Sequence, residues 1–219
     1  MYSLLLGTIS ELCEGKLPPA LAEQAPSGAR RASWLAGRTL LCHARAPLPE
    51  IIYGSQGKPT FSPGTPLWFN LSHSGDTIVL LLSDEGEVGC DLEVVRPREN
   101  WPTLAHAVFT PQERTELETK PSNEQLAAFW QIWTRKEAII KQCGGSAWLM
   151  ADIDSTRQTA PFVSHRWLGS LSLSICTPTP VNCAEIMVQW LHVENGKLYA
   201  GRNNLTVAQD GWGTAELDQ

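Results

Sequence analysis

The sequence predicts an α+β fold that is built from two halves. Segments with the pattern of strands, then helices, then strands again recur on each side of a charged, proline-containing break near residue 98. The chain has 219 residues, of which 42% are hydrophobic, and this is ordinary for one large globular domain or two small ones. We therefore expect an N-terminal half at residues 1–98, a C-terminal half at residues 99–193 and a flexible tail at residues 194–219.

The strands are predicted from apolar runs and from the alternation of apolar and polar residues. Residues 87–94 alternate strictly, which is typical of a strand with two different faces. Residues 170–175 also alternate and predict a half-buried strand. The other predicted strands are residues 2–9, 67–71, 77–83 and 181–193.

Helices are predicted where Gly and Pro are scarce between clear start and stop signals. Residues 29–46 are rich in Ala, Leu and Arg, with Ser27 as a candidate cap. Residues 124–142 end at a glycine pair, which favours a helix C-terminus. Between these helices, residues 47–66 contain five prolines and three glycines and are predicted to be mostly loop. Two shorter helices are predicted at residues 103–109 and at residues 111–119, the second capped by Thr110 with Pro111 in the first position.

The composition excludes several classes of protein. The longest apolar run has five residues, so no segment is expected to cross a bilayer, and the first residues lack the basic region of a signal peptide. The 17 basic and 23 acidic residues give a net charge of -6, which argues against a nucleic-acid partner. The six cysteines form no C-x-x-C pair and are expected to be reduced. We expect a cytoplasmic protein with no membrane or nucleic-acid partner.

Two acidic residues, Asp91 and Glu93, stand two positions apart on the predicted strand 87–94. Their carboxylates project from the same face, with about 6.6 Å of backbone rise between them. Carboxylates that share a face repel each other unless a cation lies between them, and oxygen ligands suit Mg²⁺. The alternative is an acidic strand face exposed to water, because so short a pattern is common.

The predicted helix 124–142 carries charged residues on and beside its apolar stripe. The stripe consists of Phe129, Ile132, Trp133 and Ile140. Lys136 falls inside the stripe, so its ammonium group must reach water or meet an anion. Glu137 and Lys141 flank the stripe at positions i and i+4, which suits either a surface ion pair or a functional site.

Arg31, Arg38 and Arg45 are spaced seven residues apart on the predicted helix 29–46 and share one face. A guanidinium removed from water needs a counter-charge, and phosphate is the partner whose geometry suits it best. The alternative is that the aliphatic stems cover apolar surface while the charged heads stay in water. Arg38, beside Trp34, fits this alternative least.

Three further residues could contact a phosphate. Ser72 and His73 lie in the predicted connection between two strands, where a single His is more often structural than catalytic. Both side chains can nevertheless donate hydrogen bonds to a phosphate oxygen. Lys58, in the predicted loop, is by itself an ordinary loop lysine.

Taken together and in order, these motifs resemble the Sfp-type 4′-phosphopantetheinyl transferases, and most of all the enterobacterial holo-acyl-carrier-protein synthases among them. The resemblance extends from about residue 30 to residue 145. The motifs that carry it are G-K-P (57–59), F-N-L-S-H-S-G (69–75), G-C-D-L-E (89–93), F-T-P-Q-E (109–113) and W-T-R-K-E-A-I-I-K (133–141).

The resemblance implies two similar α+β halves that are related by a pseudo-twofold axis, with coenzyme A in the cleft between them. It implies that Mg²⁺, or alternatively Mn²⁺, is held by Asp91, Glu93 and Glu137. The residues implied to contact coenzyme A are Ser72, His73 and Lys141 at the pyrophosphate, Lys58, Arg38 and Thr39 at the nucleotide, and Arg31 with Arg30 at a phosphate. The implied catalytic residues are Glu137 as base, Lys141 and His73, and Glu113 matches a further family acid near the metal.

The implied reaction transfers the 4′-phosphopantetheine arm of coenzyme A to a serine of an apo acyl carrier or peptidyl carrier protein and releases 3′,5′-ADP. A monomer is expected, because one chain would supply both halves of the cleft. Two alternatives remain open from the sequence. One is a hydrolase of the coenzyme A pyrophosphate, and the other is a module that binds coenzyme A or a carrier protein without chemistry.

Overall fold

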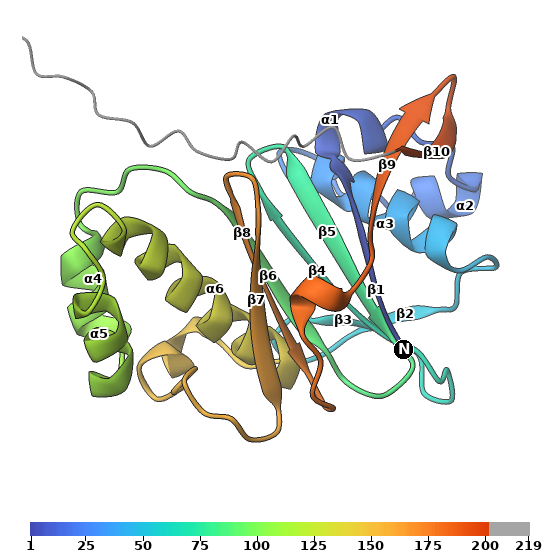
Figure 1. Ribbon diagram of the computed structural model, residues 1–219. Coiled ribbons are helices and arrows are strands. Elements are labelled where there is room, and N and C mark those ends of the chain that lie inside the picture. The colour runs from blue at the N-terminus through green and yellow to red at the C-terminus, as the bar shows by residue number, and fades with distance from the viewer. Residues whose placement is uncertain (202–219) are drawn as a thin grey trace, which may run out of the picture.

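The computed structural model describes residues 1–201, and these residues form the predicted α+β fold (Figure 1). The strands are β1 (Tyr2–Thr8), β2 (Ile51–Tyr53), β3 (Pro59–Phe61), β4 (Trp68–Ser74), β5 (Thr77–Ser83), β6 (Gly89–Val94), β7 (Phe162–Leu168), β8 (Leu171–Thr177), β9 (Val188–Glu194) and β10 (Lys197–Gly201). The helices are α1 (Ile9–Leu12), α2 (Pro19–Ala22), α3 (Arg31–Ala44), α4 (Trp101–Val108), α5 (Pro111–Glu118) and α6 (Gln125–Cys143), with short 3₁₀ turns η1 (Ala147–Ala151) and η2 (Cys183–Glu185).

Two main sheets pack face to face. One has the order β10-β9-β1-β5-β4, and the other has the order β6-β8-β7. Leu4 and Leu6 of β1 point into the core between the sheets, where they meet side chains such as Leu173 of β8. Leu5, between them in sequence, points to the opposite face and packs against α3, including Leu40. Strands β1 and β5 are thus covered on both faces, which explains why they are continuous apolar runs.

Helix α6 covers the outer face of the three-stranded sheet (Figure 1). It crosses the start of β6 so closely that a Cβ atom on Gly89 would collide with the Ala138 carbonyl oxygen and the Gln142 backbone nitrogen. The helix ends at Gly144, whose φ of 66° is left-handed, as the glycine pair predicts. The predicted cap of α5 is also confirmed, because Thr110 and Glu113 form a capping box.

Strand β4 joins the two sheets through its side chains. The backbone N–H groups of Cys90, Leu92 and Val94 lie on the edge of β6 that faces β4. They donate to side-chain oxygens of Asn70 (2.9 Å), Ser72 (3.2 Å) and Ser74 (3.1 Å), respectively. In a regular sheet these N–H groups would donate to backbone carbonyls of a neighbouring strand. Here every second side chain of β4 accepts these hydrogen bonds instead, so the N–H groups at the edge of β6 are paired.

Several local predictions need correction. Helix α3 begins at Arg31 without a side-chain cap, so Ser27 is not its cap. Strand β8 is buried along its whole length and not on one face only. Its polar face is covered by α6, where the Thr134 hydroxyl hydrogen-bonds with Ser172 (3.0 Å) and Ser174 (2.9 Å), so the alternating polar residues do not mark solvent.

Other differences concern chain topology. The predicted loop 47–66 contains the hairpin β2–β3, β7 has no strand-like alternation in the sequence, and β10 lies within the predicted tail. Strand β6 precedes residue 98 but pairs with β8, whereas β9 returns to lie parallel to β1. Each predicted half thus contributes a strand that pairs with a strand of the other half. The domain boundary near residue 98 stays a prediction. The rest of the predicted tail, residues 202–219, lies outside the described residues.

Within residues 1–201, no helix is long and apolar enough to cross a membrane. All six cysteines are free thiols, as expected from their spacing.

Substituting Gly89 with Ala should lower the free energy of unfolding by about 2 kcal/mol or more, because the new methyl group forces α6 away from β6. Chemical denaturation followed by circular dichroism measures this loss. Gly54→Ala is the matched control, since its Cβ would meet only the Lys58 carbonyl oxygen at 3.7 Å. Equal stability of the two variants would contradict the close approach.

The half-buried ring of His165 should make stability depend on pH. Burial lowers the pKa of His165 from 6.5 to about 4, and Arg135 acts in the same direction. Between these two values the unfolded chain binds a proton that the folded chain does not. The free energy of unfolding should therefore fall as the pH drops from 6.5 to 4, by up to about 3 kcal/mol. In His165→Gln this slope should flatten, whereas His43→Gln, at an exposed position, should keep it.

Candidate active site

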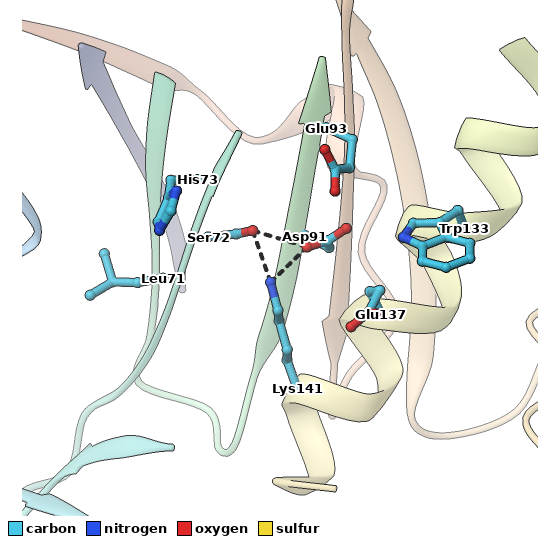
Figure 2. A pocket seen from close by; sticks show the side chains of 8 residues that line it. All are labelled: Leu71, Ser72, His73, Asp91, Glu93, Trp133, Glu137 and Lys141. Carbon is cyan, nitrogen blue, oxygen red and sulfur yellow. Dashed lines mark hydrogen bonds and ion pairs between the residues drawn. The ribbon is translucent and has the colours of Figure 1, made fainter. Parts of the chain in front are cut away.

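A polar pocket of about 380 Å³ lies where β4, β6 and α6 meet (Figure 2). Residues of all three elements line it: Leu71, Ser72, His73, Asp91, Glu93, Trp133, Glu137 and Lys141. The pocket therefore gathers every metal ligand that the family resemblance implies and every residue implied to contact the pyrophosphate. Ser72 and His73 lie within β4 and not in a turn, which corrects the sequence prediction.

The geometry of the sheet explains why the acidic groups face α6. Asp91 and Glu93 pair across β6 and β8 with Ser174 and Ser172, the two residues whose hydroxyls contact α6. Both carboxylates therefore project from the face of the sheet that α6 covers. On the helix, Glu137 and Lys141 follow Thr134 at i+3 and i+7, so they extend the same contact stripe toward the pocket.

Asp91, Ser72 and Lys141 form a closed triangle of hydrogen bonds (Figure 2). Lys141 Nζ donates to Asp91 Oδ1 at 2.6 Å and to Ser72 Oγ at 2.8 Å. The Ser72 hydroxyl donates in turn to Asp91 Oδ1 at 2.9 Å. With the N–H of Leu92 as a second donor to it, the hydroxyl of Ser72 has used its proton and both lone pairs.

Lys141 forms an ion pair with Asp91. The surface ion pair between Glu137 and Lys141, one of the two alternatives for these residues, is not what the structure shows. Burial by itself would lower the pKa of the Lys141 ammonium group, but Asp91 offsets this effect and the net pKa is raised. Lys141 therefore stays charged in the pocket. Its side chain is 30% exposed to solvent, so a ligand can reach it.

The other two carboxylates hold their protons more strongly than usual. Burial raises the pKa of Glu137, and the negative charge of Asp91 adds to this effect. Burial also raises the pKa of Glu93, although the hydrogen bond from Ser74 (2.6 Å) opposes the shift. Three carboxylates thus face one ammonium group in the pocket, and the excess of negative charge favours a bound cation.

The donor set suits a hard divalent cation. All three candidate ligands offer carboxylate oxygens, and Asp91 Oδ2 is buried without a hydrogen-bond partner among the described residues. Within residues 1–201, no three side chains of His, Cys, Asp or Glu lie close enough together to hold a metal ion in their present positions. Holding one would therefore require the Glu93 and Glu137 side chains to turn toward Asp91.

A second cavity of about 200 Å³ shares Leu71 and Lys141 with the pocket and is also lined by residues 56–59. Lys58 stands in its wall, but its ammonium group donates to Glu87 (2.6 Å) and to the carbonyls of Val88 (3.3 Å) and Gln142 (2.9 Å). These bonds fix the β2–β3 hairpin against the end of α6. A ligand here would meet the stem of Lys58 rather than a free charge.

Four predicted contacts with coenzyme A do not line this pocket or the cavity beside it. Arg38 lines a separate cavity and bonds to Tyr53. Thr39 is buried, and its side chain faces Gly15. Arg31 is exposed at the start of α3, and Arg30 is exposed directly before it.

Glu113 does not line the pocket that holds the three candidate metal ligands. Glu113 is fully buried and accepts hydrogen bonds from Lys136 (2.6 Å), from the backbone of Thr110 and from Ser155. Of the two alternatives for Lys136, reaching water or meeting an anion, the same contact shows the second. Glu113 and Lys136 are therefore structural partners that hold α5 and α6 together.

The motif 69–75 contains Asn70, Leu71 and Ser74, but the sequence predicts no individual role for these three residues in the site or its support. Alternation along residues 69–75 contained the signal, because polar side chains recur at every second position there. The sequence pattern predicts Trp133 only as part of the apolar stripe, but the residue stands one helical turn before Glu137 and lines the pocket.

Comparison with known proteins agrees with this site. The sequence pattern of the 4′-phosphopantetheinyl transferase superfamily matches residues 87–192. The 4′-phosphopantetheinyl transferase AcpT of Salmonella typhi is 65% identical over 180 residues, which cover 82% of this chain and 94% of that protein. AcpT of Escherichia coli K12 is 60% identical over 195 residues, 89% of this chain and 100% of that protein. A 4′-phosphopantetheinyl transferase of Bacillus subtilis is 36% identical over 110 residues, 49% of this chain and 47% of that protein.

The similarity to the two AcpT proteins extends over most of both chains. The resemblance inferred from the motifs is thereby confirmed: the chain belongs to the 4′-phosphopantetheinyl transferase superfamily.

Proposed function

We propose that this protein transfers the 4′-phosphopantetheine arm of coenzyme A to a serine hydroxyl of an apo acyl or peptidyl carrier protein. The observation that supports this most is the Asp91–Ser72–Lys141 triangle, which stands beside two further carboxylates in a pocket of about 380 Å³. Family membership supplies the reaction class, and the pocket supplies groups for each part of that reaction.

In this reaction the serine oxygen forms a bond to the phosphorus that carries the pantetheine arm. The bond from that phosphorus to the bridging oxygen of the pyrophosphate breaks, and 3′,5′-ADP leaves with the electron pair. The serine proton must pass to a base. Glu137 is our candidate, because its raised pKa makes it a stronger base than an ordinary carboxylate.

Negative charge accumulates on the leaving phosphate, and Lys141 is the charged donor placed to stabilise it. His73 is exposed in the wall of the pocket and can donate a further hydrogen bond. Ser72 holds Lys141 in place through its hydroxyl. In this proposal, residues of β4 and α6 bind the pyrophosphate.

We further propose that Asp91, Glu93 and Glu137 hold Mg²⁺, or Mn²⁺ in its place. A bound divalent cation would supply charge neutralisation between these carboxylates and the pyrophosphate. We propose a cation because the pocket contains more carboxylates than ammonium groups. Without a bound cation, these carboxylates would repel an anionic substrate. A glutamate that also holds the ion is a weaker base, so the proton of the serine could reach Glu137 through a water molecule.

We also propose the donor substrate, the oligomeric state and the cellular compartment of this protein. Coenzyme A is the donor substrate, and its adenosine would extend into the 200 Å³ cavity beside Lys58. One chain supplies β4, β6 and α6, so a monomer suffices. The cytoplasm, where coenzyme A and carrier proteins meet, is the expected compartment.

The proposal is tested by incubating an apo carrier protein with this protein, coenzyme A and Mg²⁺, followed by mass spectrometry. The carrier should gain roughly 340 Da, the mass of one phosphopantetheine arm, and EDTA should abolish the gain. Consumption of coenzyme A without modification of any carrier would identify a hydrolase instead. Bound but intact coenzyme A with no carrier modified would identify a binding module.

Asp91→Asn should reduce the transfer rate at least about 100-fold, because it removes a charge from the proposed ion site and the partner of Lys141. The amide can still accept a hydrogen bond, so the fold should persist in circular dichroism. Glu11→Gln, on the exposed surface far along the chain from the pocket, is the control. A fully active Asp91→Asn variant would exclude Asp91 as a metal ligand.

Lys141→Met should lower the turnover number about 100-fold or more, since the aliphatic chain remains but the ammonium group beside the leaving phosphate is lost. Steady-state kinetics at saturating coenzyme A separates this effect from weaker binding. Lys120→Met, at an exposed position outside the pocket, is the matched control. Unchanged turnover in Lys141→Met would contradict its role at the phosphate.

A further inference from the structure

Arg98 stands beside the acidic pocket without a carboxylate partner of its own. Its guanidinium lies 5.4 Å from the centre of the Trp133 ring and 5.7 Å from that of Trp130, and Trp133 lines the pocket. Within residues 1–201 Arg98 forms no ion pair, not even with the exposed neighbour Glu99. Its side chain donates one hydrogen bond, a long one of 3.4 Å from Nε to Asn100.

The two indole rings hold this guanidinium in place while its edge stays free. Stacking on an aromatic face uses the plane of the guanidinium and not its N–H groups. The chain that carries Arg98 is fixed as well, because Trp130 Nε1 donates to the carbonyl oxygen of Arg96 at 3.1 Å. Arg98 is half-buried, so part of its surface remains accessible to a partner. A fixed guanidinium with free N–H groups suits a carboxylate or a phosphate.

Arg98 and the cavity beside Lys58 lie at opposite ends of the pocket. Lys141, Glu137 and Trp133 stand on successive turns of α6 (Figure 2). Lys141 and Trp133 are eight residues apart, which corresponds to a rise of about 12 Å along the helix. The cavity beside Lys58 adjoins Lys141 and the glycines that end α6, whereas Arg98 packs on Trp133.

The proposed reaction determines which substrate meets each end. If the leaving 3′,5′-ADP occupies the end at Lys141 and Lys58, the attacking oxygen must approach from the opposite side, because the attacking and leaving oxygens of phosphoryl transfer are roughly in line. The carrier protein therefore arrives at the end with Trp133 and Arg98. The pantetheine arm has hydroxyl, amide and thiol groups but no charge, so it cannot neutralise Arg98. The anion for Arg98 must then come from the carrier protein.

We propose that Arg98 is a specificity-determining residue that binds a carboxylate of the carrier protein beside the serine that accepts the arm. The free N–H groups of its guanidinium form parallel hydrogen bonds with that carboxylate. Arg96, exposed two positions earlier, adds positive charge to the same segment. The surface of the carrier protein around the serine is therefore acidic. This inference rests on the proposed transferase function.

The test measures steady-state transfer at saturating coenzyme A and Mg²⁺ with the concentration of carrier varied. The carrier is an apo acyl carrier protein that the unaltered protein modifies in the mass-spectrometric assay. Arg98→Glu should raise KM for this carrier at least about tenfold, while the turnover number and KM for coenzyme A stay within about twofold. Arg98→Lys should have a smaller effect, since it keeps the charge but not the planar fork. Arg157→Glu, exposed and outside the pocket, is the matched control and should leave KM unchanged.

A second arm changes only the carrier. Each Asp or Glu close to its serine is replaced by Lys in turn, and one of these changes should raise KM for the unaltered protein about tenfold. The same carrier variant should recover part of that loss with Arg98→Glu, because the two reversed charges attract each other. If Arg98→Glu fails to fold, the carrier variants decide: an unchanged KM for all of them would overturn the proposal.

Three other results would overturn it. A carrier KM in Arg98→Glu equal to that of the unaltered protein would exclude Arg98 from carrier recognition and leave the transferase function intact. A raised KM for coenzyme A with an unchanged KM for the carrier would assign Arg98 to coenzyme A instead. Failure of the unaltered protein to modify any carrier would overturn the transferase function and this inference with it.

Discussion

The outer edge of β6 is the constraint on which the rest of the structure depends. Its N–H groups have no strand beside them in their own sheet, and β4 satisfies them with the side chains of Asn70, Ser72 and Ser74. A hydroxyl that accepts from one N–H can still donate its own proton. Ser72 donates to Asp91 and Ser74 donates to Glu93, so the bonds that join the sheets also orient the two carboxylates.

The same arrangement explains how the fold tolerates buried negative charge. Asp91 is compensated by Lys141 and Ser72, whereas burial raises the pKa values of Glu93 and Glu137 and the negative charge of Asp91 adds to this effect. Unpaired charge of this kind costs folding free energy and is usually found where a ligand supplies the missing partner. The electrostatics of the pocket thus favour the proposed cation, and through it an anionic substrate.

Local patterns were sufficient to predict much of the fold and the site. Alternation in β6 placed Asp91 and Glu93 on one face, and periodicity with a glycine stop predicted α6. What failed depended on tertiary contacts. Ser72 and His73 resemble a turn because Ser and Gly surround them, but pairing with β5 keeps them in a strand. Arg38 shares a helical face with Arg31, yet Tyr53 and Trp34 direct it into a cavity of its own.

Two lysines of α6 show how burial separates structure from function. Lys136 and Lys141 are five residues apart, which turns them by about 140° around the helix axis. Lys136 is completely buried on Glu113, so it fixes the rotation of α6 against α5 and the chain at Ile153. With that rotation fixed, Lys141 must point to the opposite side, over Asp91, where part of its side chain stays accessible. A lysine that is fully enclosed can only hold the helix, while one at the rim can exchange its carboxylate contact for a phosphate.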